Sequence, residues 1–243
     1  MGRVVIHSTS AASAHLPLPP SEITKWELNE MKITVFGATG RIGAAAVQQA
    51  LDTGHEVTAV VRDPARLGVD HHPSLEVVKI RDLADTKAVR AALKGRDAVI
   101  SGIGPRGPKD GPVATNATRG ILAAMAAAGV KRLVAVSAVP VGPVPVGESF
   151  INRRLLRPAM KALLRDLYAD LAAMEEEIRI SATAWTVVRP PKLVSKPLTG
   201  IYRSVIGANV PRGYLVSRAD TAHLMLAALG DPATIGQPVG IAY

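Results

Sequence analysis

The feature that most constrains this chain is a short apolar run that leads into a glycine loop and then into an alanine-rich stretch. Residues 33–36 predict a buried strand, and residues 44–51 predict a helix. Glycines between them let a backbone approach a pyrophosphate, and the third lets helix and sheet pack closely. The phosphates then lie at the positive end of the helix. We expect a dinucleotide site here, with a plain strand–turn–helix as the alternative. Its first cofactor-binding residues are Gly37, Thr39, Gly40, Arg41, Ile42 and Gly43.

Strands and helices alternate along the rest of the chain. The expected strands are residues 55–61, 75–80, 97–101, 132–137, 183–188 and 239–242, and the expected helices are residues 85–93, 113–128, 153–180 and 220–229. Such alternation implies parallel βαβ units and a doubly wound parallel sheet. We therefore predict an α/β Rossmann fold, a single NAD(P)-binding domain over residues 31–243 with a small C-terminal substrate-binding part. Residues 1–30, rich in Ser, Ala and Pro, are expected to be a disordered extension.

The end of the second expected strand indicates which dinucleotide binds. An NAD site usually places a carboxylate about 20 residues past the glycines. Here the position is Arg62, and a guanidinium suits a 2′-phosphate. Arg66 and Arg41 can converge on the same phosphate, whereas Asp63 before Pro64 is typical of a helix N-cap. We predict NADP rather than NAD. The alternative is a solvated loop arginine.

The ends of the later strands supply further candidates, because ligands bind outside the carboxyl ends of parallel strands. Asp82 and Leu83 follow the third strand, where a carboxylate can accept from the adenine amino group. Gly104, like Gly102, follows the fourth strand, where bare backbone can approach the ribose and nicotinamide. Ser137 ends the fifth strand. For Asp82, an ordinary turn residue is the alternative.

Composition narrows the function classes. The chain has no cysteine, which excludes disulfides, thiolate metal sites and cysteine nucleophiles. The net charge of +9 raises nucleic acid or an anionic membrane as partners. The basic residues are spread along the chain and aromatic residues are few, so anionic small ligands explain the charge as well. We expect no metal, no nucleic-acid partner, no stable membrane association and a cytoplasmic location.

Several motifs together resemble a known family. They are residues 37–43 (GATGRIG), 61–67 (VRDPARL), 129–138 (GVKRLVAVSA), 185–193 (WTVVRPPKL), 196–202 (KPLTGIY) and 217–220 (SRAD). With them the chain resembles an atypical short-chain dehydrogenase/reductase of the NAD(P)H-binding, NmrA-like family, and within it the biliverdin-IXβ reductase/flavin reductase type. The resemblance implies an NADPH-dependent reductase that transfers hydride to a planar conjugated acceptor such as a flavin, tetrapyrrole or quinone. It also implies a monomer or a weak homo-oligomer.

The chain departs from this family at the proton donor. Short-chain dehydrogenases use a Tyr-x-x-x-Lys pair, but Tyr168 is followed by Ala172, and Leu171 stands where the lysine would fall. We therefore interpret Tyr168 as a packing or rim residue. The active-site serine of the family corresponds either to Ser137 or, in an ungapped alignment, to the position of Ala138. We expect Ser137 to orient the nicotinamide amide.

Lys192 follows the Pro-Pro pair, where the similar reductases have a histidine. Its ammonium can bind the cofactor diphosphate or an anionic substrate, or it is a solvated loop lysine. Ser137 and Lys192 are our candidate catalytic residues.

The absence of a Tyr-x-x-x-Lys proton donor favours a particular kind of acceptor. A ketone that accepts hydride becomes an alkoxide and needs a nearby proton donor. A flavin or tetrapyrrole delocalises the charge and can take its proton from water. Two alternatives remain: a non-catalytic NADP(H)-sensing regulatory protein of the NmrA-like kind, and a carbonyl reductase of a secondary metabolite. Arg154, Arg157, Lys161 and Arg165 recur at helical spacing and predict either an amphipathic lid or a solvated helix face.

Overall fold

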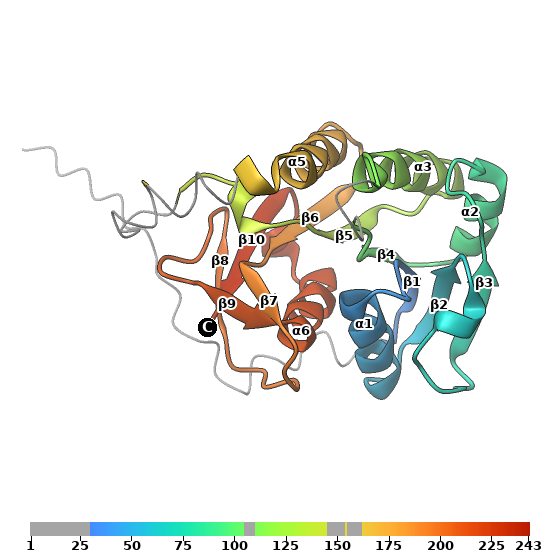
Figure 1. Ribbon diagram of the computed structural model, residues 1–243. Helices are drawn as coiled ribbons and strands as arrows, with labels where there is room; N and C mark the ends of the chain where they lie inside the picture. Colours follow the sequence, from blue (N-terminus) through green and yellow to red (C-terminus); the bar gives the residue numbers. More distant parts are fainter. Residues whose placement is uncertain (1–29, 105–109, 145–153, 155–161) are drawn as a thin grey trace, which may run out of the picture.

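The computed structural model describes residues 30–104, 110–144, 154 and 162–243, and its centre is a twisted sheet (Figure 1). The strands of this sheet stand in the order β3-β2-β1-β4-β5-β6-β10-β8, and only β8 runs antiparallel to its neighbour. The order confirms the predicted doubly wound α/β fold. Its strands are β1 (Lys32–Phe36), β2 (Glu56–Val61), β3 (Leu75–Lys79), β4 (Ala98–Ser101), β5 (Arg132–Val136), β6 (Ala184–Arg189), β8 (Arg203–Ile206) and β10 (Gln237–Ala242).

Helices cover both faces of the sheet (Figure 1). One face carries α1 (Arg41–Asp52) and α6 (Arg218–Leu229), and the other carries α2 (Thr86–Leu93), α3 (Val113–Ala128) and α5 (Arg165–Arg179). Short 3₁₀ helices are η2 (Pro64–Arg66), η3 (Val139–Val141) and η5 (Pro232–Thr234). Each face has its own apolar core: Ile33 and Met225 belong to the first, and Phe36 and Met125 to the second. None of the helices in the described part is long and apolar enough to cross a membrane.

The sequence located most of the main elements to within a few residues, but no strand was predicted where β8 lies. The last helix begins at Arg218 rather than at residue 220, because the Ser217 side chain accepts from the Asp220 N–H and so sets the cap two residues earlier. The expected helix over residues 153–180 is described as α5 only from Arg165 on. Arg157 and Lys161 of the expected lid lie outside the described residues, as do residues 1–29 of the expected extension.

A second small sheet was not expected. It pairs β7 (Lys192–Val194) with β9 (Leu215–Ser217) in parallel. Each strand has three residues, too few for an alternating pattern to show in the sequence. The pair lies in the C-terminal part and places Lys192 and the residues that follow it next to the start of α6.

Candidate cofactor and active site

The glycine loop lies at the switch point of the sheet, between the carboxyl ends of β1 and β4, from which the chain winds in opposite directions. Gly37 has φ +75°, and a Cβ there would meet the Gly102 carbonyl carbon at 2.8 Å. A Cβ on Gly43 would lie 2.2 Å from the Gly37 oxygen. The Gly102 N–H donates to the Phe36 oxygen at 2.9 Å. Three glycines thus pack backbone against backbone, which joins β4, the loop and α1.

Gly40 differs from the other glycines of the loop. It precedes α1 with φ −83° and ψ 159°, and its N–H donates to the Gly37 oxygen at 2.8 Å. A Cβ there would lie 3.1 Å from that oxygen, a tight but not prohibitive contact. No side chain of the described residues caps α1, and its first turn carries no acid. The uncapped N–H groups therefore fit an anionic ligand such as a dinucleotide phosphate.

Beside Gly40, the three expected neighbours differ in exposure. Ile42 is buried in the core and can offer a ligand only its backbone. Thr39 is half-buried, and Arg41 is exposed as the first residue of α1.

Arg62 and Arg66 lie beyond the end of β2, at the same edge of the sheet. Phe36 of β1 pairs with Val60 of β2, so Arg62 is two residues past the level of Phe36 and lies beside the glycine loop. Both arginines are exposed, and among the described residues neither is in an ion pair. Asp63 caps η2 by accepting from the Ala65 N–H at 3.2 Å, which confirms the predicted cap. The carboxylate is therefore engaged in the turn, and the guanidinium groups are available to a ligand.

The residues after β3 and β4 are placed differently from one another. The Asp82 side chain is exposed and accepts a hydrogen bond from the Ala84 N–H at 2.9 Å. This is the contact expected of an ordinary turn residue, the alternative to an adenine contact. Leu83 is half-buried, and its carbonyl lies so close to α3 that a Cβ on Gly120 would be 2.0 Å from it. Gly104 is exposed and directly precedes residues 105–109, which are not described.

Ser137 is the most informative candidate. It follows β5, and its N–H donates to the Val188 oxygen of β6 at 2.8 Å. The residue is 7% exposed, and among the described residues its hydroxyl has no hydrogen-bond partner. A buried hydroxyl without a partner is costly, so its presence at the carboxyl edge fits a ligand that completes the hydrogen bond.

Lys192 and Tyr168 have contrasting surroundings. Lys192 begins β7 and is exposed, while its N–H donates to the Tyr214 oxygen at 3.2 Å. Tyr168 is half-buried in α5 and packs against the second core. Burial raises the pKa of the Tyr168 phenol, so it is a poorer acid than an exposed tyrosine. Leu171, where a short-chain dehydrogenase would have lysine, is 6% exposed.

The sequence did not reveal a buried carboxylate that fixes the C-terminal part. Asp220 accepts from the Thr199 and Gly200 N–H groups, both at 2.9 Å. It also accepts from the hydroxyls of Ser217 at 2.7 Å and Tyr243 at 2.5 Å. Burial acts to raise the pKa of Asp220, but these hydrogen bonds outweigh it and leave the pKa below its usual value. The two motifs at residues 196–202 and 217–220 are the sequence signal from which this interaction could have been found, because Asp220 connects them.

A second missed interaction holds the segment after β5. Arg189 makes a two-point ion pair with Glu175 of α5, with Nε donating to Oε1 at 3.0 Å. The pair is mostly buried, and a Cβ on Gly142 would meet Arg189 Nη1 at 2.5 Å. The Asn209 side chain donates to the oxygens of Val139 and Pro143. Together these contacts fix residues 138–143 beside Ser137.

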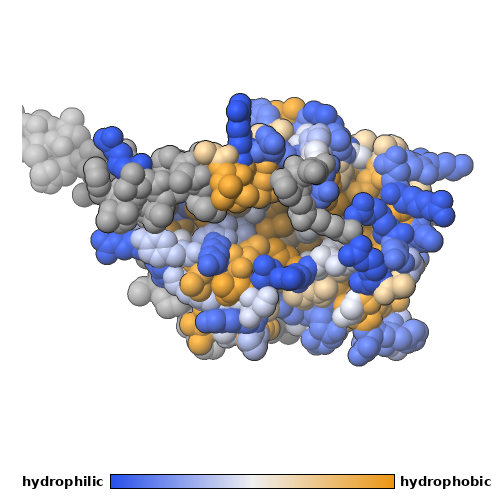
Figure 2. Space-filling model, in the orientation of Figure 1, coloured by the Kyte–Doolittle hydropathy of each residue, from blue (hydrophilic) through white to orange (hydrophobic). Residues whose placement is uncertain are grey.

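One face of the molecule carries a concentration of hydrophobic side chains (Figure 2). Hydrophobic side chains gather in the middle of this face, in the region between α5 and α6, with hydrophilic side chains around them (Figure 2). Several large apolar side chains of the C-terminal part are exposed, among them Leu198, Ile201, Tyr214 and Leu215. Apolar surface next to a polar cofactor site suits an acceptor with an extended ring system.

Comparison with known proteins agrees with this geometry. Residues 37–232 match a protein family described as NAD(P)H-binding. The chain is 33% identical over 184 residues to the (4-alkanoyl-5-oxo-2,5-dihydrofuran-3-yl)methyl phosphate reductase of Streptomyces griseus, covering 72% of this chain and 55% of that protein. It is 35% identical over 111 residues to the divinyl chlorophyllide a 8-vinyl-reductase of Zea mays, covering 46% of this chain and 25% of that protein. The chain thus spans little more than half of the first relative and a quarter of the second.

Solved structures share the fold. A Streptococcus pneumoniae protein described as a candidate NADH-flavin reductase superposes with a TM-score of 0.71 at 24% identity, over 87% of this chain and 99% of that one. A short-chain dehydrogenase/reductase of Veillonella parvula in complex with NADP superposes with a TM-score of 0.70 at 18% identity, over 88% of this chain and 95% of that one. At these identities the likeness establishes the Rossmann fold alone.

Proposed function

The chain belongs to the NAD(P)H-binding family, and we propose that it is an NADPH-dependent reductase that transfers hydride to a planar conjugated acceptor of the flavin, tetrapyrrole or quinone type. The observation that carries the proposal is the buried hydroxyl of Ser137 at the carboxyl edge of the sheet, for which the described residues offer no hydrogen-bond partner. A protein that only needed the fold would have no reason to keep this hydroxyl without a partner. The biliverdin-IXβ reductase/flavin reductase type within the NmrA-like group is the proposed subfamily.

The cofactor would be held by several parts of the site. The uncapped start of α1, with Gly40 before it, would bind the diphosphate through N–H groups. Arg62 and Arg66 would bind the 2′-phosphate through charge-assisted hydrogen bonds, which is our reason for proposing NADP. The Ser137 hydroxyl would hydrogen-bond the nicotinamide amide, and Lys192 would bind the diphosphate or an anionic acceptor. Asp82, Leu83 and Gly104 remain proposed contacts of the adenosine and ribose.

When bound, the nicotinamide supplies the hydride, and the protein's task is to hold an acceptor flat against it. The chain offers no Tyr–Lys pair, and burial raises the pKa of Tyr168, so a solvent proton is the proposed source. An acceptor that delocalises the incoming charge tolerates this arrangement, whereas a simple ketone does not. Two of the similar proteins are named for a chlorophyllide and a flavin, which supports a conjugated acceptor.

The missing Tyr–Lys pair also favours a second candidate, a non-catalytic NADP(H)-sensing protein. A measurement of NADPH turnover distinguishes the reductase from the sensor. We expect steady NADPH oxidation when FMN, a quinone or a tetrapyrrole is supplied, and little with simple carbonyls. Tight NADP(H) binding with no turnover on any acceptor would favour the sensor instead.

Paired variants test the site within the enzyme proposal. Ser137→Ala should lower kcat by about tenfold or more, since the nicotinamide loses an orienting hydrogen bond. Tyr168→Phe, which keeps the ring that packs against the core, should retain most turnover. A loss of roughly a hundredfold for Tyr168→Phe with Ser137→Ala nearly normal would reverse the roles and point to carbonyl reduction.

A further inference from the structure

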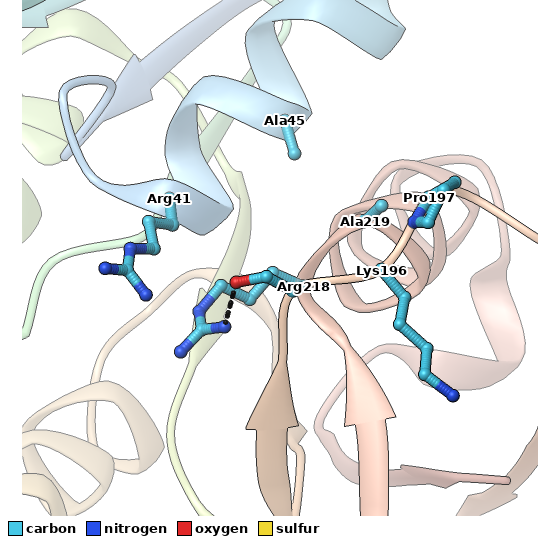
Figure 3. Close-up of a pocket in the computed structure, with 7 residues that line it drawn as sticks. Arg41, Ala45, Lys196, Pro197, Arg218 and Ala219 are labelled. Atoms are coloured by element: carbon cyan, nitrogen blue, oxygen red, sulfur yellow. Dashed lines mark hydrogen bonds between the residues drawn. The ribbon is translucent and has the colours of Figure 1, made fainter.

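Two arginines from the starts of two helices line one groove (Figure 3). Arg41 is the first residue of α1, and Arg218 is the first residue of α6. Their guanidinium groups extend toward the same side, whereas the Lys196 side chain points away from them (Figure 3). The groove has a volume of about 470 Å³, and its other lining residues are Ala45, Ser195, Lys196, Pro197 and Ala219.

No acidic residue balances the charge of this groove among the described residues that line it. The lining contains Arg41, Lys196 and Arg218 but no acidic residue. Partial burial lowers the pKa of Arg218, and the positive charge of Arg41 lowers it further. The two guanidinium groups carry like charges on the same side of the groove and therefore repel each other. Asp220, in the first turn of α6, is engaged with Thr199 and Gly200 and does not relieve this repulsion.

The groove is held in place by hydrogen bonds. Arg218 Nη1 donates to Ser195 Oγ at 3.0 Å, which fixes the guanidinium against the segment after β7. Four residues further on, the Asp220 carboxylate holds that segment at Thr199. Across the groove, Gln49 Nε2 of α1 donates to the Ala219 oxygen of α6 at 3.0 Å. Arg218 is therefore held in place by a hydrogen bond, and the two helices that carry the arginines are joined to each other, as a preorganised anion site requires.

We propose that Arg41 and Arg218 bind the phosphate group of an anionic acceptor, so that Arg41 serves the acceptor rather than the cofactor 2′-phosphate that its sequence position suggested. The starts of α1 and α6 lie at the carboxyl edge of the sheet, next to the glycine loop, so an acceptor anchored here reaches the crevice where hydride transfer is proposed. Two guanidinium groups form several charge-assisted hydrogen bonds with a dianionic phosphate and remove their mutual repulsion. The inference rests on the proposed reductase function, since it names the acceptor's class as phosphate-bearing.

A second basic groove of the molecule offers a matched control. It is lined by Lys87 and Arg90 of α2, by Lys94 at the C-cap of α2, and by alanines of α2 and α3. These basic side chains are exposed and come from one helix. Arg90→Ala thus removes one positive charge and one guanidinium, as Arg218→Ala does, without touching the proposed site.

The first test measures binding directly. Protein saturated with NADP⁺ is titrated with inorganic phosphate at constant ionic strength, and the melting temperature is followed. Phosphate should stabilise the natural protein and the Arg90→Ala variant equally, and Arg218→Ala should weaken the apparent affinity by about tenfold or more. No phosphate effect on the NADP⁺-saturated natural protein would overturn the proposal, as would an equal effect on Arg218→Ala.

The second test compares FMN with riboflavin, which share the ring system and differ by a phosphate. Arg218→Ala should raise KM for FMN by about tenfold or more and leave KM for riboflavin and NADPH within about twofold. A parallel loss of NADPH affinity would assign the groove to the cofactor and refute the acceptor site. If neither flavin is turned over but phosphate still binds through Arg218, the flavin acceptor of the proposed function fails while the anion site stands.

Discussion

Gly40, which precedes α1, and Gly43, in the first turn of α1, are three residues apart, yet substitutions at them should have opposite consequences. In Gly43→Ala the new Cβ would lie 2.2 Å from the Gly37 oxygen and 2.7 Å from its carbonyl carbon. An ordinary contact is about 3.5 Å, so backbone must move by roughly an ångström. Overpacking of this kind costs about 1–3 kcal/mol, and the upper end applies because both partners are backbone. For a domain of this size we expect Tm to fall by roughly 6–12 °C.

In Gly40→Val the fold should survive and the cofactor should be lost. The Cβ would lie 3.1 Å from the Gly37 oxygen, and φ −83° with ψ 159° suits a β-branched residue. Without cofactor, the variant should melt within about 3 °C of the natural protein. NADPH at a hundredfold excess over its Kd should stabilise the natural protein by about 2.7 kcal/mol. The side chain of valine blocks the approach of the diphosphate, so most of this stabilisation should disappear.

The assay is a thermal melt of each variant with and without NADPH, beside circular dichroism at low temperature. Gly68→Ala is the matched control, because a Cβ there meets nothing within 4 Å. The reasoning is refuted if folded Gly40→Val keeps the full NADPH shift, or if Gly43→Ala melts like the natural protein. The first result would mean that the diphosphate does not bind at this loop. The second would mean that the backbone around Gly43 can shift at little cost in stability.

Three further predictions concern single side chains. Arg62→Ala should weaken NADPH binding by about 1.5–3 kcal/mol in a calorimetric titration and leave NADH nearly unchanged, and equal losses for both would contradict the 2′-phosphate assignment. Lys192→Ala should mainly raise KM for anionic acceptors, which a comparison of anionic with neutral quinones would check. Burial lowers the pKa of His55 below 6.5, and the charge of Glu30 opposes this shift in part. The neutral ring accepts a hydrogen bond at Nδ1 from the Met31 N–H. As the pH falls, the unfolded chain therefore binds the proton at His55 before the folded protein does. The stabilisation is therefore full above pH 6.5 and declines as the pH falls through the folded-state pKa, and His55→Gln should flatten this part of the stability curve measured by urea unfolding.

The sequence predicted those parts of the fold that depend on local patterns. The helix over residues 113–128 ends at Gly129 with φ +77°, as the glycine suggests. Likewise, Asp63 before Pro64 caps a short helix. In both cases the signal and the structure lie within a few residues of each other.

Interactions between distant residues were not predictable in the same way. Buried Arg132 donates to the oxygens of Ala228 and Leu229 and so closes the end of α6, although almost a hundred positions separate them. Asp170 of α5 accepts from the Ala114 and Thr115 N–H groups, both at 2.9 Å, and caps α3 in place of a local residue. A single sequence contains no pattern for such pairs, because their spacing depends on how the layers stack.

The same distinction explains why the glycine motif identifies a ligand class but not an activity. Gly37, Gly43 and Gly102 are required by the packing of β1, β4 and α1, so an enzyme and a sensor built on this fold would need them equally. Function is better sought in polar groups for which the described fold has no use. The Ser137 hydroxyl is buried with no hydrogen-bond partner among the described residues, and Arg41 and Arg218 carry like charges in a groove whose described lining contains no acid. Each of these is unfavourable in the protein alone, and a bound ligand with the complementary group makes it favourable.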